Sequence, residues 1–244
     1  MANSNAAKPA PASDRPMRRS NVRATTAATR EKIMMAAETL MGERGLFSVS
    51  LREISAAAGQ GNTNAAQYHF DNRAGLIAAI FEFRTMQFEP VRQEMLDRMA
   101  GQGRLLDDRC LVQCLCYPFV LATNGEGRFS FAGFMASYLT RYRGSGVPHP
   151  FDIHETAPPA LKALRELVAQ RLCFLEKDHA WRRMSMAASS FCNMLVRAEA
   201  SGVRGGTTEF AFLVRDTVEQ LRAALCVRSP DDVAGIFAVP GMED

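Results

Sequence analysis

The chain has 244 residues, of which 47% are hydrophobic and 23% charged, with a formal net charge of +3. A chain of this size and composition can bury one or two sizeable cores, which excludes disorder throughout. It contains no run of about 18 apolar residues and no apolar segment of the secretory-signal type near its start. The composition therefore predicts a cytoplasmic protein without membrane contact.

The reactive residue types form no recognisable catalytic or metal-binding pattern. The four histidines are scattered, and the sequence contains no GxSxG, phosphate-loop or HExxH motif. None of the six cysteines belongs to a CxxC pair, so we interpret them as small apolar residues of a reduced core. The sequence predicts no enzyme, no catalytic residue, no metal site and no cofactor.

The charge is unevenly distributed along the chain. Residues 1–30 carry six basic residues and one acidic residue, a net charge of +5, so the rest of the chain sums to −2. Residues 1–25 are rich in Ala, Pro, Ser and Arg, which predicts a disordered basic arm. The arm is interpreted either as a contact to DNA or as a solubilising tail.

The first 70 residues contain three predicted helices. Apolar residues recur every three or four positions from Thr29 until Gly45. Ser50 and Glu53 fit a capping box that begins a second helix, which ends at Gly59. A third short helix follows a turn and covers 62–69. Asp71 is then expected to cap a fourth helix.

The remainder also shows helical spacing, with no convincing strand. We expect a helix from Asn72, and we expect Pro90 to start or kink a segment that reaches about Ala100. An irregular loop is expected at 143–159. The other helical segments are expected within 105–122 and 129–142 and over 159–176, 178–202 and 207–227. The predicted fold is all-α. Its expected parts are a disordered arm (1–25), a helix-turn-helix DNA-binding domain (26–71), a helical effector-binding and dimerisation domain (72–228) and a tail (229–244).

The third predicted helix carries short polar side chains and an aromatic pair, and too few apolar residues for a core element. Gln and Asn can pair with adenine in the major groove, and a Thr methyl group can contact thymine. Thr63 and Gln67 are one helical turn apart, as are Asn64 and Tyr68. This pattern favours a recognition helix of a helix-turn-helix.

Residues 29–76 resemble the DNA-binding domain of the TetR family of bacterial transcriptional regulators. The matching positions are Thr29-Arg30-Glu31-Lys32-Ile33, Ala36-Ala37, Leu40, Gly45, Ser50-Leu51-Arg52-Glu53-Ile54, Ala58-Gly59, Tyr68-His69-Phe70, Arg73 and Leu76. The resemblance implies a ligand-responsive homodimer, most often a repressor, that leaves a palindromic operator when a small, largely apolar effector binds. The alternative is a regulator that has no effector and acts through protein partners.

The resemblance also implies which residues contact DNA. Ser50, Tyr68 and His69 would contact the phosphate backbone, although Ser50 is also explained as a helix cap. Arg52 would reach phosphate or a base, and Arg73 stands where the family usually has Lys. The side chains expected in the major groove are those of Thr63, Asn64 and Gln67. Ala65 and Ala66 replace larger residues, which leaves the base preference open.

In this family the larger domain binds the effector and dimerises. The resemblance implies dimerisation through the helices predicted over 178–202 and 207–227. The alternative is that these helices are simply central to the fold. Each effector candidate is equally explained by core packing; the candidates are Phe81, Met86, Met95, Cys114, Tyr117, Phe134, Tyr138 and Trp181. If the effector carries a carboxylate or phosphate, Arg141 or Arg143 would pair with it. His149 and His154 are interpreted as loop residues.

Overall fold

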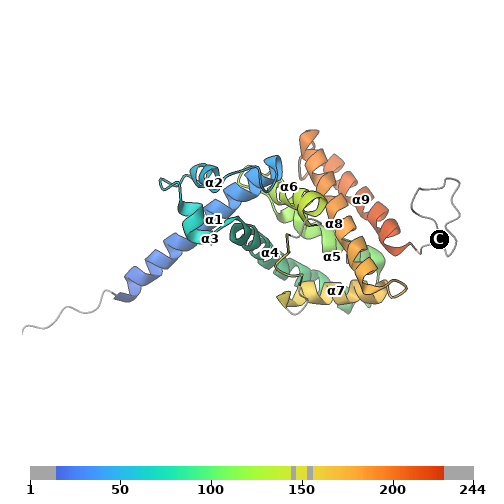
Figure 1. The fold of residues 1–244 in the computed structure, drawn as a ribbon. Coiled ribbons are helices and arrows are strands. Elements are labelled where there is room, and N and C mark those ends of the chain that lie inside the picture. The colour runs from blue at the N-terminus through green and yellow to red at the C-terminus, as the bar shows by residue number, and fades with distance from the viewer. Residues whose placement is uncertain (1–14, 144–146, 153–155, 228–244) are drawn as a thin grey trace, which may run out of the picture.

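A computed structural model describes residues 15–143, 147–152 and 156–227, and within these ranges it contains helices and no strand (Figure 1). This confirms the predicted all-α class. No helix in the described part is both long and apolar enough to cross a membrane. The α-helices, in chain order, are α1 (Arg15–Arg44), α2 (Leu51–Ala57), α3 (Ala65–Phe70), α4 (Arg73–Gly101), α5 (Asp108–Leu121), α6 (Ser130–Ser137), α7 (Pro159–Arg171), α8 (Lys177–Ala200) and α9 (Thr208–Cys226).

The first helix begins earlier than the sequence suggested. α1 starts at Arg15 rather than Thr29, so the expectation that residues up to 25 are disordered is wrong for 15–25. Residues 1–14 lie outside the described ranges. Pro16 was taken as evidence against a helix, but it occupies the first turn, where no intrahelical bond requires its missing N–H. The first turns of α1 project away from the body of the molecule (Figure 1).

The caps of the short helices follow from local sequence. The predicted capping box is present: the Ser50 amide donates to Glu53 Oε2 at 2.8 Å, and the Glu53 amide donates to Ser50 Oγ at 3.1 Å. Asp71 does not cap α4, because it ends α3 with a φ of 62°. Asn72 takes that role, and its Oδ1 accepts from the Gly75 amide at 3.0 Å.

Two prolines lie inside helices, and the segment that Pro90 was expected to start or kink is part of one helix. Pro90 lies inside the continuous α4 and Pro118 inside α5. Phe88 and Arg92, on either side of Pro90, are both buried. Packing against both halves of α4 therefore stabilises the helix across the one backbone bond that proline removes. The helix predicted over 129–142 is α6 followed by a π-helical segment, Tyr138–Tyr142.

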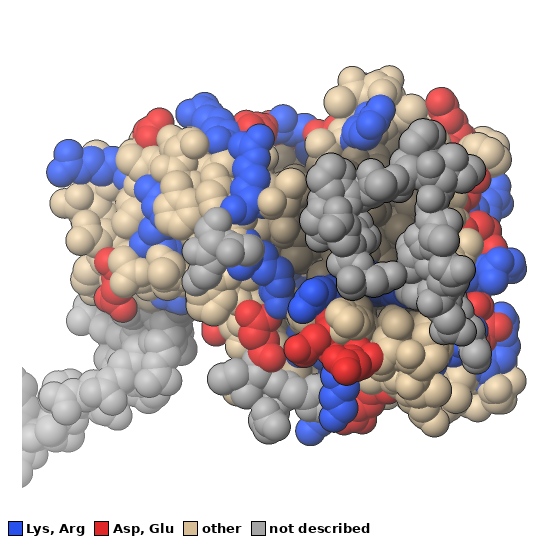
Figure 2. All heavy atoms as spheres, turned by 45° about the vertical axis from the view of Figure 1, so that its right-hand side comes forward, with Lys and Arg blue, Asp and Glu red and all other residues tan. Residues whose placement is uncertain are grey.

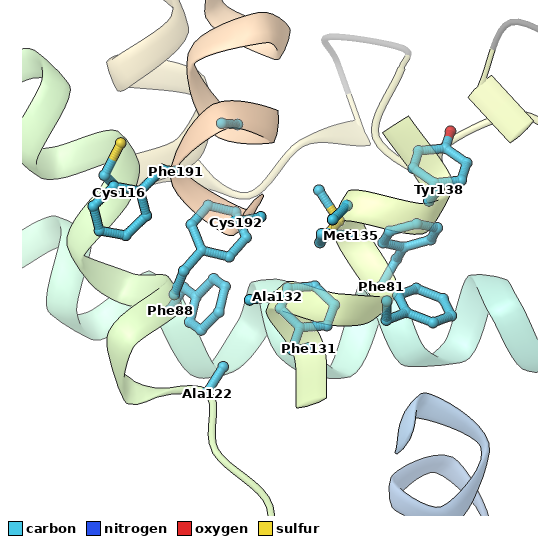
Figure 3. Packing of buried hydrophobic residues seen from close by; sticks show 14 of the residues in the cluster. Phe81, Phe88, Cys116, Ala122, Phe131, Ala132, Met135, Tyr138, Phe191 and Cys192 are labelled. Atoms are coloured by element: carbon cyan, nitrogen blue, oxygen red, sulfur yellow. The ribbon is translucent and has the colours of Figure 1, made fainter. Parts of the chain in front are cut away.

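One continuous cluster of buried apolar side chains runs through both predicted domains, so the boundary expected at residue 71 stays a prediction. Figure 3 shows Phe81, Phe88 and Phe131 within this cluster. α1 and α6 approach closely at Gly42, where an added Cβ would lie 2.9 Å from the backbone nitrogen of Phe134. The predicted tail 229–244 lies outside the described residues.

A buried ion pair also joins the two predicted domains. The guanidinium of Arg84 in α4 donates from Nε to Glu38 Oε2 and from Nη2 to Glu38 Oε1, each at 2.7 Å. Ser130, at the start of α6, donates its hydroxyl to the same carboxylate. Glu38 is fully buried and Arg84 almost so. The contact fixes α1 relative to both α4 and α6.

Candidate nucleic-acid interface and ligand cavity

The buried side of α3 holds it against α2. Ala65, Ala66 and Phe70 are buried, and the Ala66 amide donates to Ser55 Oγ at 3.0 Å. The Ser55 hydroxyl in turn donates to the Leu51 carbonyl at 2.9 Å. Sequence reasoning missed this contact, for which the only signal is a small hydroxyl residue on the inward side of α2. Because Ala65 and Ala66 face inward, their small size sets the packing of α3.

The outward side of this region collects four residues predicted to contact DNA, three in the major groove and Tyr68 at the phosphate backbone. Thr63, Asn64, Gln67 and Tyr68 are all exposed, and 80% of Tyr68 is accessible. Thr63 and Asn64 precede α3 instead of lying within it, in a turn where the Asn64 amide donates to Asn62 Oδ1 at 3.0 Å. The four side chains therefore lie along α3 and the turn before it, with the core contacts on the other side.

Ser50 and Arg52 occupy the first turn of α2, and both are exposed. The cap uses Ser50 Oγ as an acceptor, so its O–H can still donate to a phosphate. The bonds from Ser50 to Glu53 lower the pKa of the Glu53 carboxyl group, which keeps an acidic group in the same turn. The Ser50 hydroxyl and the Arg52 guanidinium are thus accessible, and their contact with DNA stays a prediction.

His69 is half-buried at the end of α3. Its carbonyl accepts a hydrogen bond from Arg30 Nη1, and the Arg30 guanidinium lies 4.3 Å from the centre of the Phe70 ring. Burial first, and the nearby Arg30 charge second, lower the pKa of His69 below its ordinary value. A contact from His69 to phosphate would therefore be a neutral N–H hydrogen bond near pH 7, and it stays a prediction.

Arg73 differs from the other predicted contact residues because it is half-buried. Its Nη1 donates to the Leu46 carbonyl at 2.7 Å and to the Val49 carbonyl at 2.5 Å, and its guanidinium lies 5.7 Å from the Phe47 ring centre. Arg73 thus ties the start of α4 to the loop before α2. Its phosphate contact stays a prediction, whereas the contact with the loop is a feature of the fold.

Charge is mixed over the surface that can be seen. Figure 2 shows basic and acidic side chains interspersed on one face of the molecule. Within residues 31–76 the sequence has Lys32, Arg44, Arg52 and Arg73 against five acidic residues. The helix-turn-helix itself is therefore nearly neutral, and the cluster of positive charge lies at the start of α1.

The residues predicted to line one effector site lie in separate places. Phe81, Cys114, Phe134 and Tyr138 are buried core residues and line no described cavity. Met86 is 57% exposed on α4. Met95 and Tyr117 line an open groove of about 660 Å³ between α4, α5 and the start of α9. Trp181 lines a different, smaller cavity.

That smaller cavity has a volume of about 90 Å³ and lies among α4, α5, α6, α7 and α8. Its apolar lining includes the rings of Phe88, Phe119 and Phe131. Its polar lining includes His149 and Arg143, one of the two arginines predicted to pair with an anionic effector. The other, Arg141, is exposed and does not line this cavity. His154 lies outside the described residues. Sequence reasoning missed two further lining residues, Arg92 and Arg165.

Arg165 and Arg143 are both held in place at this cavity. Arg165 Nη1 donates to the Phe151 carbonyl at 2.6 Å, and its guanidinium lies 4.4 Å from the centre of the Trp181 ring. Arg143 Nη2 donates to Asp152 Oδ1 at 2.6 Å. Burial lowers the pKa of Arg165 to about 10, so its guanidinium remains charged near neutral pH.

The cysteines offer no reactive thiol in this cavity. All six are free, and Cys114, Cys116 and Cys192 are buried. Burial raises the pKa of Cys114 to about 11 and the pKa of Cys116 well above its ordinary value. These thiols are therefore protonated near neutral pH and pack as small apolar groups.

No protein-family model and no curated protein sequence matches this chain. It is similar to the crystal structures of two gamma-butyrolactone receptors described as ArpA-like. The first is 22% identical, with a TM-score of 0.44 and with 81% of this chain and 98% of that chain covered. The second is 20% identical, with a TM-score of 0.43 and with 81% and 97% covered.

A third similar structure is that of a candidate TetR-family transcriptional regulator from Mesorhizobium loti. It is 14% identical, with a TM-score of 0.42 and with 81% of this chain and 96% of that chain covered. With TM-scores of 0.42 to 0.44, these similarities leave open what this chain binds.

Proposed function

We propose that this chain is a DNA-binding transcriptional regulator of the TetR type, and that a ligand bound among α4–α8 controls its binding to an operator. The observation that carries the proposal is the two-sided α3. Ala65, Ala66 and Phe70 anchor it in the core, while Gln67 and Tyr68 are presented to solvent. Exposed Gln and Tyr on a short, rigidly held helix suit contacts with base edges and phosphates.

We propose that the protein acts as a homodimer through α8 and α9, which pack against each other. Both helices expose large apolar side chains outward: Met186 is 68% exposed on α8 and Phe212 is 59% exposed on α9. A twofold partner would cover these side chains and pair two recognition helices. The action as a repressor is proposed from the family resemblance.

Selection of bound duplexes from a random DNA pool tests the proposed function. We expect a palindromic consensus whose half-sites are separated by about 34–36 Å, one helical turn, or a multiple of that distance. An enriched sequence without twofold symmetry would contradict the dimer arrangement. Recovery of no enriched sequence would contradict the proposed function itself.

The basic start of α1 is expected to contribute affinity without specificity. Substituting Arg18, Arg19 and Arg23 with Gln keeps helix propensity nearly constant, because the two residue types have similar propensities. We expect weaker operator binding. The slope of the logarithm of the binding constant against the logarithm of the salt concentration should become shallower by up to about 0.9 for each lost phosphate contact. The selected consensus should stay the same.

Fluorescence anisotropy over a range of salt concentrations measures this slope. Arg98→Gln, on the exposed side of α4, is the control for the loss of a single positive charge far along the chain from residues 29–76, and it should leave the slope unchanged. A slope that is unchanged in the triple variant would identify the basic segment as a solubilising element.

A further inference from the structure

Arg92 is a buried cation whose guanidinium lies 5.3 Å from the centre of the Phe88 ring. It is 4% exposed, and its Nε and Nη1 atoms are buried and have no hydrogen-bond partner. No ion pair within the described residues includes it. A buried charge left unpaired carries a desolvation penalty of several kcal/mol, so such a group calls for a compensating anion.

A second buried arginine on the same helix, Arg84, has its hydrogen-bond donors paired within the protein. Arg84, two turns before Arg92, makes two hydrogen bonds of 2.7 Å to Glu38 and one of 2.9 Å to Gln87. Arg92 has the nearby Glu89, but the Glu89 carboxylate accepts the amides of Ala160 and Leu161 at the start of α7. The carboxylate of Glu89 therefore forms its hydrogen bonds with the start of α7 and not with Arg92.

Arg92 lines the 90 Å³ cavity, together with two further arginines, Arg143 and Arg165. Arg143 is neutralised by Asp152, whereas Arg165 contacts only a carbonyl and the Trp181 ring and leaves its own Nε without a partner. Burial lowers the pKa of His149 to about 3, so the imidazole adds no charge near neutral pH. The charged groups at the cavity thus sum to a positive excess.

The rest of the lining selects among anions. Phe88, Phe119 and Phe131 line the cavity together with the arginines, and Leu115 and Met184 extend the apolar surface. Phe88 and Phe131 lie close together in Figure 3, with ring centres 5.7 Å apart. The cavity volume of about 90 Å³ is larger than the about 10–15 Å³ that one water molecule requires. It is smaller than the roughly 150 Å³ of a cavity that binds benzene, so it suits a small ligand.

We propose that this cavity binds a short-chain carboxylate, with the anionic head at the guanidinium of Arg92 and the hydrocarbon body against the phenylalanine rings. Charge-assisted hydrogen bonds from arginine to carboxylate are among the strong ones in proteins. The proposal names the class of ligand that would control the proposed regulator. Binding of the carboxylate does not depend on the proposed function, whereas its effect on DNA binding rests on that function.

The test uses the full chain and measures its melting temperature with sodium butyrate. We expect the melting temperature to rise with carboxylate concentration, because a ligand that binds only the folded state stabilises it. Butyramide, which has the same shape without the charge, and sodium chloride at equal ionic strength should give no rise. A rise with inorganic phosphate equal to that with butyrate would contradict the choice of a carboxylate with an apolar body.

Variants separate a binding role of Arg92 from a structural one. Arg92→Met should lose the butyrate response, with at least a tenfold weaker Kd by calorimetry, while its melting temperature without butyrate is unchanged or higher. Arg98→Met, an exposed arginine of the same helix, should keep the response. Ser185→Leu fills the cavity from α8 and should also abolish binding, which keeps the test decisive if Arg92→Met does not fold.

The outcomes distinguish this proposal from the proposed function. A wild-type protein that does not respond to butyrate, or an Arg92→Met variant that keeps the response, would overturn the carboxylate site and leave operator binding untouched. Butyrate binding that depends on Arg92 but leaves the operator affinity unchanged would uphold the site and contradict ligand control of DNA binding.

Discussion

Replacing Gln67 and Tyr68 together by alanine will remove sequence-specific DNA binding and leave the fold intact. Both side chains are exposed, and Tyr68 is 80% accessible, so their truncation removes no core contact. A well-placed base contact, here that of Gln67, contributes about 1–3 kcal/mol of discrimination, and the predicted phosphate contact of Tyr68 adds affinity, so the loss of both should weaken operator binding by about tenfold or more. A mobility-shift titration on the selected operator measures this.

The matched control for this pair is Gln93→Ala combined with Met86→Ala. Both residues are exposed on α4, and Gln93 makes only a surface hydrogen bond with Asp97. Both double variants should melt within a few degrees of the wild type, because exposed substitutions change stability by about 0.5 kcal/mol or less. Operator binding by Gln67→Ala/Tyr68→Ala at wild-type strength would refute α3 as the recognition helix.

Arg84→Met will lower the free energy of unfolding by about 3–5 kcal/mol, because it leaves the carboxylate of Glu38 buried with no counter-charge. Glu38 is fully buried, and after the substitution the hydroxyl of Ser130 would be its remaining side-chain hydrogen-bond donor. The loss should show in urea denaturation as a lower midpoint. Because the pair joins α1 to α4 and α6, the variant should also loosen the helix-turn-helix from the larger domain.

Two further variants make this result specific to an unpaired buried charge. Arg98→Met breaks the exposed Arg98–Glu94 pair, whose side chains are 70% and 73% accessible, and should cost at most about 0.5 kcal/mol. Glu38→Leu combined with Arg84→Met removes both charges and should recover most of the lost stability. An Arg84→Met cost no greater than that of Arg98→Met would show that the pair does not stabilise the fold.

Local chemistry made much of the first part of the chain predictable. The capping box at Ser50 and the helix end at Gly59 depend on residues within one turn of each other, and both are present. The helices α7, α8 and α9 follow from apolar spacing and from glycine or proline at their ends, and they match the prediction within a few residues, except that α7 ends at Arg171. Errors of local interpretation arose where proline was given too much weight, at the start of α1 and in α4.

Position along a helix also carried a signal that sequence reasoning did not use. Arg84 and Arg92 both occupy the buried stripe of α4, at the same spacing as Phe81, Phe88 and Leu96. An arginine at such a position predicts either a buried partner or a bound anion. The spacing alone does not say which, because Glu38 lies 46 residues before Arg84 in the chain.

The sequence by itself determined the all-α class, the short helix α3 and the polar residues exposed on it, because helix spacing and caps act over one or two turns. Only the tertiary structure decided that Ala65 and Ala66 face the core, that Arg73 holds a loop, and that the effector candidates are dispersed. It alone also showed that Arg84 is paired with Glu38, whereas Arg92 Nε and Nη1 have no hydrogen-bond partner. These features depend on contacts between residues far apart in the chain, which helix periodicity does not specify.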